Sequence, residues 1–356
     1  MKSGKTLTEL AVELDRQRKV KKDYLIDTRN IVLDPVNNGF QLTLQGEGQN
    51  ILLGVNEVAH EQIGSYTGVP ARYYDKMRNE NPELLCVNVN SWFQKDPDVR
   101  MVRSLDGTAR AFLSDRYRRI DNFEVAESVL PVIADIEDAR VESCEVTDNR
   151  MYLKVVNPRL QGEVSVGDVV QSGILITNSE VGRGCLNVQP LIYRLVCSNG
   201  MVVNDGARMR KYHVGRSGMY GQMDDYSVFS DETLMADDKA LMLKVRDTVR
   251  AAVDEVRFRK VLKKMQDAKD AKITTKNIPK MIELVGSDFK LGKGEQDGVL
   301  NHLIRDGEFS LYGLSNAVTR AAQDVESYDR STDMESIGYT ILGMSRDSWN
   351  RLNNAA

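Results

Sequence analysis

Apolar residues in the N-terminal part of the chain fall into short alternating runs that end at turn dipeptides, which is the pattern of antiparallel strands. In the clearest case, residues 99–105 and 108–114 place apolar side chains opposite one another across Asp106-Gly107. Because Asp-Gly tolerates the positive φ angles of a type I′ turn, these runs predict a β-hairpin. Asn-Gly dipeptides elsewhere carry the same signal. The residues predicted to serve hairpin turns are Gly39, Gly107, Asn199 and Gly200.

Helices are predicted between these strands. One covers residues 56–66, a second begins at Pro70, and a third over residues 123–136 is interrupted or bent near Pro131. Proline is tolerated at the first helical position because its missing N–H would have no partner there. Hairpins with intervening helices predict an α+β fold, in which an antiparallel or mixed sheet carries helices on one face. The same pattern argues against βαβ repetition and a Rossmann fold.

The pattern becomes helical after about residue 228. Met242, Val245 and Val249 recur at spacings near 3.5 residues, and Thr332 with Glu335 forms a capping-box signature for a later helix. The helical part is either a second domain or a wrap around the sheet. We therefore expect three regions: a basic N-terminal arm or short helix over residues 1–30, an α+β sheet domain over 31–228, and a helical C-terminal region over 229–356.

Composition limits the function classes. The chain has 356 residues, 41% hydrophobic and 28% charged, with a net charge of −4, so nucleic acid can be contacted only through a local basic patch. Its four cysteines have no regular spacing, which fits a reducing compartment. The N-terminus is charged throughout, and no stretch approaches the roughly 20 apolar residues that span a bilayer. We expect a cytoplasmic protein without membrane contact.

Signatures of cofactor and metal chemistry are weak. The sequence has no phosphate-binding glycine loop and no G-x-G-x-x-G, and its three histidines are far apart. The pairs Asp224-Asp225 and Asp237-Asp238 fit solvated helix starts better than a magnesium site. Cys197 lies where an apolar strand enters a turn, as a structural cysteine does. We expect no cofactor and no metal.

Two segments of the β-rich region combine cations with aromatic rings. The first covers residues 110–119, and the second, residues 183–216, has six Lys or Arg against one acid, Asp205. Cations neutralise phosphates and planar rings stack on any base, so this combination is typical of proteins that hold single strands. The alternative is a loop whose arginines are solvated or paired with acids. The candidate nucleic-acid contacts are Arg116, Tyr117, Arg118, Arg119, Arg183, Arg194, Arg208, Arg210, Lys211, Tyr212 and His213.

Several motifs, in order along the chain, resemble one known family. AFLSDRYRRIDNFEV, ITNSEVGRGCLNV and YRLVCSNGMVV, followed by His213-Val-Gly215, are similar to the phage- and plasmid-borne proteins grouped as domain of unknown function 932. HEQIGSYTGVPARYYDKM resembles the front of that family, and LYGLSNAVTRAA and MESIGYTIL resemble its tail. The resemblance implies a setting near DNA-metabolism genes and no agreed activity. At fold level alone, the chain is similar to phage single-strand annealing proteins of the lambda beta-protein type, which form rings or filaments.

We expect a binding module rather than an enzyme. It would be an accessory of phage or plasmid DNA metabolism that holds single-stranded DNA, promotes annealing or recombination, and assembles into homo-oligomers. This hypothesis requires the two basic segments to converge into one electropositive groove. The alternative is a structural or protein-binding phage protein, such as a virion component or a host-directed factor, without nucleic-acid binding. A third hypothesis is a metal-dependent enzyme that uses Asp115 and Asp121.

Overall fold

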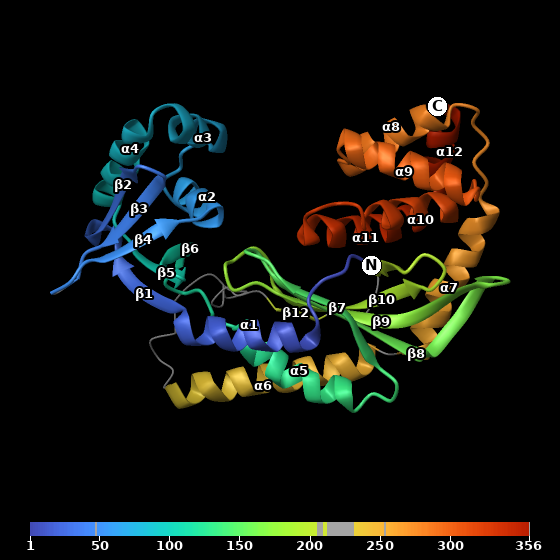
Figure 1. The fold of residues 1–356 in the computed structure, drawn as a ribbon, viewed down its shortest axis with the longest axis horizontal. Coiled ribbons are helices and arrows are strands. Elements are labelled where there is room, and N and C mark those ends of the chain that lie inside the picture. The colour runs from blue at the N-terminus through green and yellow to red at the C-terminus, as the bar shows by residue number, and fades with distance from the viewer. Residues whose placement is uncertain (47, 205–208, 212–230, 253, 356) are drawn as a thin grey trace.

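The computed structural model describes residues 1–46, 48–204, 209–211, 231–252 and 254–355. Within them the strands form two six-stranded sheets (Figure 1). We call β1–β6 the N-terminal sheet and β7–β12 the central sheet. The single sheet domain expected over residues 31–228 therefore contains strands of both sheets, while the domain boundaries themselves stay a prediction. None of the helices in the described parts combines the length and the apolar composition that crossing a bilayer requires.

The N-terminal sheet has the order β1-β5-β6-β4-β3-β2 and is antiparallel except where β4 runs parallel to β6. Helices cover one of its faces, because alternate strand residues such as Leu42, Val102 and Phe112 are buried against Ile63 and Phe93. The strands are β1 (Lys22–Asp27), β2 (Ile31–Val36), β3 (Gly39–Leu44), β4 (Ile51–Val55), β5 (Val99–Leu105) and β6 (Thr108–Ser114), and the helices are α2 (Glu57–Tyr66), α3 (Ala71–Glu80) and α4 (Pro82–Lys95).

The central sheet has the order β11-β10-β9-β8-β7, and β12 also pairs with β10. Unlike the N-terminal sheet, it is covered on both faces, which explains why its middle strands are buried along most of their length. The strands are β7 (Arg140–Val146), β8 (Met151–Ser165), β9 (Asp168–Asn178), β10 (Leu186–Arg194), β11 (Asn199–Val202) and β12 (Met209–Lys211).

Two helical layers sandwich the central sheet (Figure 1). One consists of α1 (Leu7–Val20), α5 (Asn122–Ala134) and α6 (Asp231–Ala252). The other contains α7 (Glu255–Asp270), α8 (Ile278–Phe289), α9 (Lys293–Asp306), α10 (Leu311–Ala321), α11 (Tyr328–Leu342) and α12 (Arg346–Ala355). The predicted α+β class with a helical C-terminal region is confirmed. That region wraps the central sheet, so the expectation of helices on one face holds for the N-terminal sheet alone.

The hairpin predictions fared differently. Asp106 and Gly107 have φ angles of 51° and 74°, as a type I′ turn requires. Gly39 also has a positive φ, of 127°, but it opens β3 opposite Val36, so the two turn residues precede it. The prediction for Asn199-Gly200 is wrong, because both residues lie inside β11, where Gly200 pairs with Tyr193.

Close packing, not a turn, accounts for the glycine at position 200. The chain reverses direction just before β11, at a turn in which Ser198 takes a φ of 51°. A Cβ on Gly200 would lie 2.7 Å from Cγ of Met1 and 3.2 Å from a carboxylate oxygen of Glu335. Because glycine has no Cβ, the side chains of Met1 and Glu335, which are distant in sequence, can pack against residue 200.

Two helix starts also carry information. Thr6 and Glu9 form a capping box at α1. Leu10 and Leu14 of this helix are buried, so the N-terminal segment contains a packed helix. The capping box predicted from Thr332 and Glu335 is wrong, because the N-cap of α11 is Ser327, five residues before Thr332. Both residues lie inside the helix, and both are buried. A helix is present where the sequence predicted one, but its first turn lies before the predicted cap.

Candidate functional site

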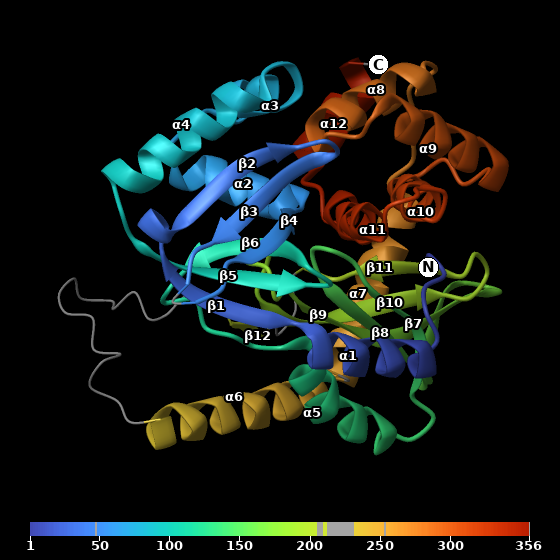
Figure 2. The same ribbon diagram turned by 60° about the vertical axis from the view of Figure 1, so that its left-hand side comes forward.

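A buried ionic cluster connects the N-terminal sheet to the central sheet; Figure 2 shows how the two sheets are arranged. We call its six residues the junction cluster. Arg103 of β5, whose side chain is 0% exposed, donates from Nε to Asp23 Oδ1 (2.8 Å) and from Nη2 to Asp121 Oδ1 (2.8 Å). Its Nη1 donates to the backbone oxygen of Glu180, 2.9 Å away. The members of the junction cluster are Lys21, Asp23, Arg103, Arg110, Asp121 and Glu180.

An irregularity in the N-terminal sheet brings a second arginine into the junction cluster. Arg103 pairs with Ala111 while Ser104 pairs with Ala109, so Arg110 is an extra residue on β6. A bulge of this kind redirects a side chain, and Arg110 forms an ion pair with Glu180, beyond the end of β9. Glu180 also accepts a hydrogen bond from the backbone N–H of Asn122, at 2.6 Å.

The junction cluster is stabilised by its own compensation of charge. Burial by itself raises the pKa of Asp121, but the nearby positive charges of Arg103 and Lys21 outweigh this effect and leave the pKa lowered. Lys21 Nζ lies 2.5 Å from Asp121 Oδ2 and 3.5 Å from Glu180 Oε1. Each buried charge has an opposite partner, and the ion pairs connect the N-terminal sheet to the segments after β9 and before α5. Each carboxylate of the cluster is paired with a lysine or arginine side chain of the same cluster.

Two of the motifs noted in the sequence contact each other beside this cluster. Asn178 Nδ2 donates to the backbone oxygen of Ile120 and to Asn122 Oδ1, both at 2.9 Å. Tyr117 donates its hydroxyl to the backbone oxygen of Ser179, at 3.0 Å. The segment after β6 is therefore attached to the end of β9. This attachment places the first basic segment at one end of the central sheet.

The first basic segment divides into exposed and internal residues. Arg116 and Arg119 are exposed, and Arg119 Nη1 is 3.7 Å from Asp23 Oδ2. Arg118 forms ion pairs with Asp237 and Asp238 of α6, with its Nη1 2.8 Å from Asp237 Oδ2. The ring of Tyr117 packs with the small apolar cluster around Leu113, and burial raises the pKa of its hydroxyl. Tyr117 is thus part of the fold.

The second basic segment divides in the same way. Arg194 is internal, donating to Asp168 at 2.6 and 3.0 Å, and Tyr312 donates to the same carboxylate at 2.8 Å. Arg183 forms an ion pair with Glu61 of α2, whose side chain is half exposed. Both arginines are therefore paired with acids, as the alternative interpretation of these segments anticipated.

Backbone pairing places β12 near the first basic segment. Arg210 of β12 pairs with Asn187 of β10, and Asn187 pairs in turn with Thr177, two residues before Ser179. The backbone at Arg210 and Lys211 therefore belongs to the same end of the central sheet as the contact between Tyr117 and Ser179. The remaining predicted contacts, Arg208, Tyr212 and His213, lie outside the described residues.

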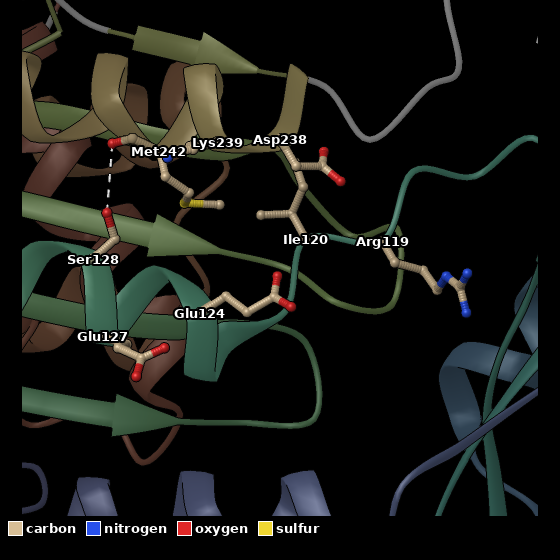
Figure 3. Close-up of a pocket in the computed structure, with 8 residues that line it drawn as sticks. All are labelled: Arg119, Ile120, Glu124, Glu127, Ser128, Asp238, Lys239 and Met242. Carbon is tan, nitrogen blue, oxygen red and sulfur yellow. Dashed lines mark hydrogen bonds between the residues drawn. The ribbon is translucent and has the colours of Figure 1, made fainter. Parts of the chain in front are cut away.

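A cleft of about 390 Å³ opens beside this end of the sheet, between α5, α6 and the loop before α5 (Figure 3). Met242 and Ile120 point into the space between the helices, whereas Arg119 points away from both helices. Glu124, in the first turn of α5, extends along the cleft toward the loop. The lining residues are Arg119, Ile120, Glu124, Glu127, Ser128, Asp238, Lys239 and Met242.

The residues suggested for an enzyme are not arranged as a pair of catalytic carboxylates. Asp115 is exposed and accepts from Ser114 Oγ at 3.1 Å, whereas Asp121 is enclosed in the junction cluster. In the described parts of the chain, no three His, Cys, Asp or Glu side chains are grouped as ligands for a metal ion.

Sequence reasoning missed the junction cluster. Arg103 and Arg110 lie in alternating strands, where a charged residue normally indicates the solvent face. Glu180 follows an apolar strand and resembles an ordinary loop acid. A signal was nevertheless present, because Arg103 interrupts the apolar run that begins at Met101-Val102, and Glu180 lies within one of the motifs that carry the family resemblance.

Comparison with known proteins identifies the family of this chain. The family described as "Domain of unknown function (DUF932)" matches residues 111–344, which include the end of β6, the whole central sheet and most of the helical layers. No curated protein and no solved structure matches the chain. Because the match covers more than half of the 356 residues, the chain belongs to this family of domains of unknown function.

Proposed function

We propose that this protein is a non-catalytic, cytoplasmic accessory of phage or plasmid DNA metabolism that binds single-stranded DNA and promotes its annealing. The observation that carries the proposal is that the first basic segment lies at the same end of the central sheet as Arg183 and the backbone of β12, which belong to the second segment and are far from the first in sequence. The proposed contact surface is smaller than the one expected from the sequence. It consists of Arg116, Arg118, Arg119, Arg183, Arg210 and Lys211.

The ion pairs at this surface are compatible with phosphate binding. Asp237 and Asp238, which hold Arg118, have half-exposed side chains, as has Glu61, which holds Arg183. An exposed ion pair such as that between Arg183 and Glu61 contributes only about 0–1 kcal/mol, so a phosphate can replace Glu61 at small cost. The side chain of Arg118 is only 12% exposed, so its pairs are screened less by solvent. Arg194 is different, because its pair with Asp168 is enclosed, and we leave it out of the surface together with Tyr117.

Binding of labelled oligo-dT, measured by fluorescence anisotropy across a salt series, tests the proposal. Removing one phosphate-binding cation should flatten the dependence of log affinity on log salt by about 0.7, so we expect a clear change in the variant Arg116→Ala/Arg119→Ala. Arg159→Ala is the matched control, since Arg159 is an exposed arginine paired with Glu137 and Asp138. Absence of binding at low salt, or binding that ignores salt, refutes the proposal. Light scattering with and without DNA tests for homo-oligomers.

A protein-binding role is the second candidate, and a specific surface favours it. Helices α3 and α4 expose four large apolar side chains, among them Val87 with 68% of its surface exposed. Large apolar side chains that are exposed on neighbouring helices can contribute to contacts with other proteins. The four residues are Tyr73, Leu84, Val87 and Trp92. Co-purification of a partner that is lost in Val87→Ser, with oligo-dT binding absent, would favour this function over DNA binding.

A further inference from the structure

The N-terminal sheet ends on one side at β1, and the backbone along the outer edge of this strand is unpaired (Figure 2). Between antiparallel strands every second residue is hydrogen-bonded, and the residues in between direct their N–H and C=O groups outward. The N–H of Thr28 donates to the backbone oxygen of Asp98, in register with β1 and β5. Counting back from Thr28, the outward residues of β1 are Asp23, Leu25 and Asp27. Within the described parts of the chain, their outward backbone groups form no hydrogen bond.

The opposite edge of the same sheet, at β2, has no N–H group left to donate. The N–H of Ile31 donates to the backbone oxygen of Thr28. Leu33 exchanges hydrogen bonds with the side-chain amide of Asn90, at 2.8 and 2.9 Å, as it would with a neighbouring strand. Pro35 has no N–H. Sheets are closed in such ways because free edge groups pair with other strands.

The edge of the central sheet at β7 is covered by the N-terminal segment. The N–H of Lys5 donates to the backbone oxygen of Cys144 at 2.7 Å, and Ser143 Oγ donates to the backbone oxygen of Lys2 at 2.9 Å. The edge at β1 has no such cover, and none of its six residues is fully buried. Its free backbone groups therefore form a surface on which another strand can pair.

We propose that β1 pairs with β1 of a second copy of this chain, antiparallel and about a two-fold axis at Leu25. In this register Leu25 lies opposite Leu25 of the partner subunit, and Asp23 lies opposite the partner's Asp27. Each outward N–H of one strand then meets an outward C=O of the other, so none of these groups stays unpaired. The two N-terminal sheets would become one continuous sheet. Dimerisation of this kind does not depend on DNA binding.

The side chains of β1 fit this pairing on both faces of the sheet. On one face Leu25, which is 64% exposed in the single chain, would pack against its counterpart across the axis. On the other face Tyr24 lies opposite the partner's Ile26, and the symmetry repeats this contact. Aromatic and β-branched side chains in such positions stabilise antiparallel pairs. Tyr24 and Ile26 already pack against the core of the N-terminal sheet, so the pairing would extend that core.

The acids of β1 do not prevent the pairing. Like charges directly opposite each other destabilise two strands, and Asp23 would face the partner's Asp27. Each of these acids, however, has a cation in its own chain: Arg103 Nε lies 2.8 Å from Asp23, and Arg29 Nη2 lies 2.7 Å from Asp27. Because β1 has only six residues, the interface is small, and we expect a reversible dimer that depends on concentration.

Sedimentation velocity of the full chain without DNA, over a series of protein concentrations, measures the dimer. Leu25→Pro removes an outward N–H and no bond to β5, and edge strands tolerate proline at such positions. We expect it to raise the dissociation constant of the dimer at least about tenfold, since one hydrogen bond is lost from each copy. Leu52→Thr is the control, because it removes an exposed leucine from β4, an inner strand, and should leave dimerisation unchanged.

A disulfide tests the register and does not depend on the folding of the proline variant. Opposite hydrogen-bonded residues have Cα atoms about 5.5 Å apart, a distance that a disulfide spans. Mild oxidation of Leu25→Cys should therefore give a covalent dimer. Val36→Cys, an exposed position on β2, should not, and the unaltered chain with its free cysteines gives the background.

Three results would overturn the proposal: a chain that stays monomeric at every concentration, a dimer that Leu25→Pro leaves intact, or a Leu25→Cys dimer that does not cross-link. Cross-linking of Leu25→Cys to another protein in an extract, with the purified chain monomeric, would show that β1 receives a foreign strand and would equally overturn pairing between copies. A monomer that binds oligo-dT would contradict the dimer alone and leave the proposed function intact.

Discussion

Lys154 and Glu335 form an ion pair in the interior, with Nζ of the lysine 2.7 Å from Oε2 of the glutamate. Their side chains are 0% and 1% exposed. Lys154 comes from β8 and Glu335 from α11, so the pair joins the central sheet to the helical layer above it. The ammonium group also lies 4.8 Å from the centre of the Tyr328 ring, which adds a cation–π contact.

We expect the removal of one partner to be more harmful than the removal of both. Lys154→Met leaves the Glu335 carboxylate buried without a cation, which should lower the free energy of unfolding by about 3–5 kcal/mol. The double variant Lys154→Met/Glu335→Leu should recover most of this stability, because neither side chain of the pair is left charged without its partner. Urea unfolding of the two single variants and the double variant gives the coupling free energy. Additive effects would show that the pair contributes through packing alone.

Arg103 should behave similarly at the junction cluster. Arg103→Met removes the cation shared by Asp23 and Asp121, and we expect the free energy of unfolding to fall by about 3–5 kcal/mol. Arg29→Met, which breaks an exposed pair with Asp27, is the control and should leave stability unchanged. Thermal unfolding followed by circular dichroism measures both. An unaltered melting temperature for Arg103→Met would mean that the sheets do not depend on this contact.

His60 should make stability depend on pH. Burial, with a smaller contribution from the Arg78 charge, lowers its pKa from 6.5 to about 4, and its Nδ1 lies 2.9 Å from the Tyr74 hydroxyl. Since the unfolded chain takes up the proton at higher pH than the folded chain does, this contribution is present above about pH 6.5 and is lost as the pH falls toward 4. The full decrease is on the order of 3 kcal/mol.

Urea unfolding between pH 7 and pH 4 measures this effect against His60→Asn, whose amide can still bond to Tyr74. Carboxylates that are paired in the folded state titrate in both proteins, so their contribution cancels in the comparison. The variant should lose less stability on acidification than the unaltered chain. Parallel curves for the two proteins would contradict the assignment of the pH dependence to His60.

Two glycines should respond to alanine in opposite directions. Gly200→Ala should destabilise the protein, because the new Cβ would lie 2.7 Å from Met1 Cγ and 3.2 Å from Glu335. Gly298→Ala, inside α9, should stabilise it by about 0.5–1 kcal/mol, since its Cβ would make an ordinary 3.5 Å contact with Ala321 and the helix gains a better former. Differential scanning calorimetry of the two variants compares them directly. A stable Gly200→Ala would mean that Met1 moves aside freely.

The sequence predicted what local signals determine. The Asp106-Gly107 hairpin and the helix that ends at Tyr66 follow from turn chemistry and from period, both of which act over a few residues. The existence of two sheets depends on pairings between distant strands, such as Lys22 with Ser104, and no local pattern specifies these. The prediction of a turn at Asn199-Gly200 failed for the same reason. The side chains that pack against Gly200 belong to Met1 and Glu335, which are distant in sequence.

The candidate site was predictable in composition but not in detail. Arg116 and Arg119 are exposed, as a solvated basic segment should be, whereas Arg194 and Tyr117 are enclosed. Whether an arginine faces solvent or a buried carboxylate depends on which acid the fold brings beside it, and Asp168 lies 26 residues away from Arg194. The charges in the sequence therefore identified the region. Tertiary packing determines which of its side chains face solvent and which are enclosed in the fold.

The place of α1 matters for anyone who works with the family-matched region alone. Leu10 and Leu14 of α1 are buried against Val129 of α5 and Ile176 of β9, yet the helix precedes the N-terminal sheet in the chain. A fragment that starts at residue 111, where the family match begins, would lack these two leucines. The apolar side chains of α5 and β9 that they cover would then be exposed to solvent. Supplying residues 1–20 as a separate peptide should rescue the solubility of such a truncation.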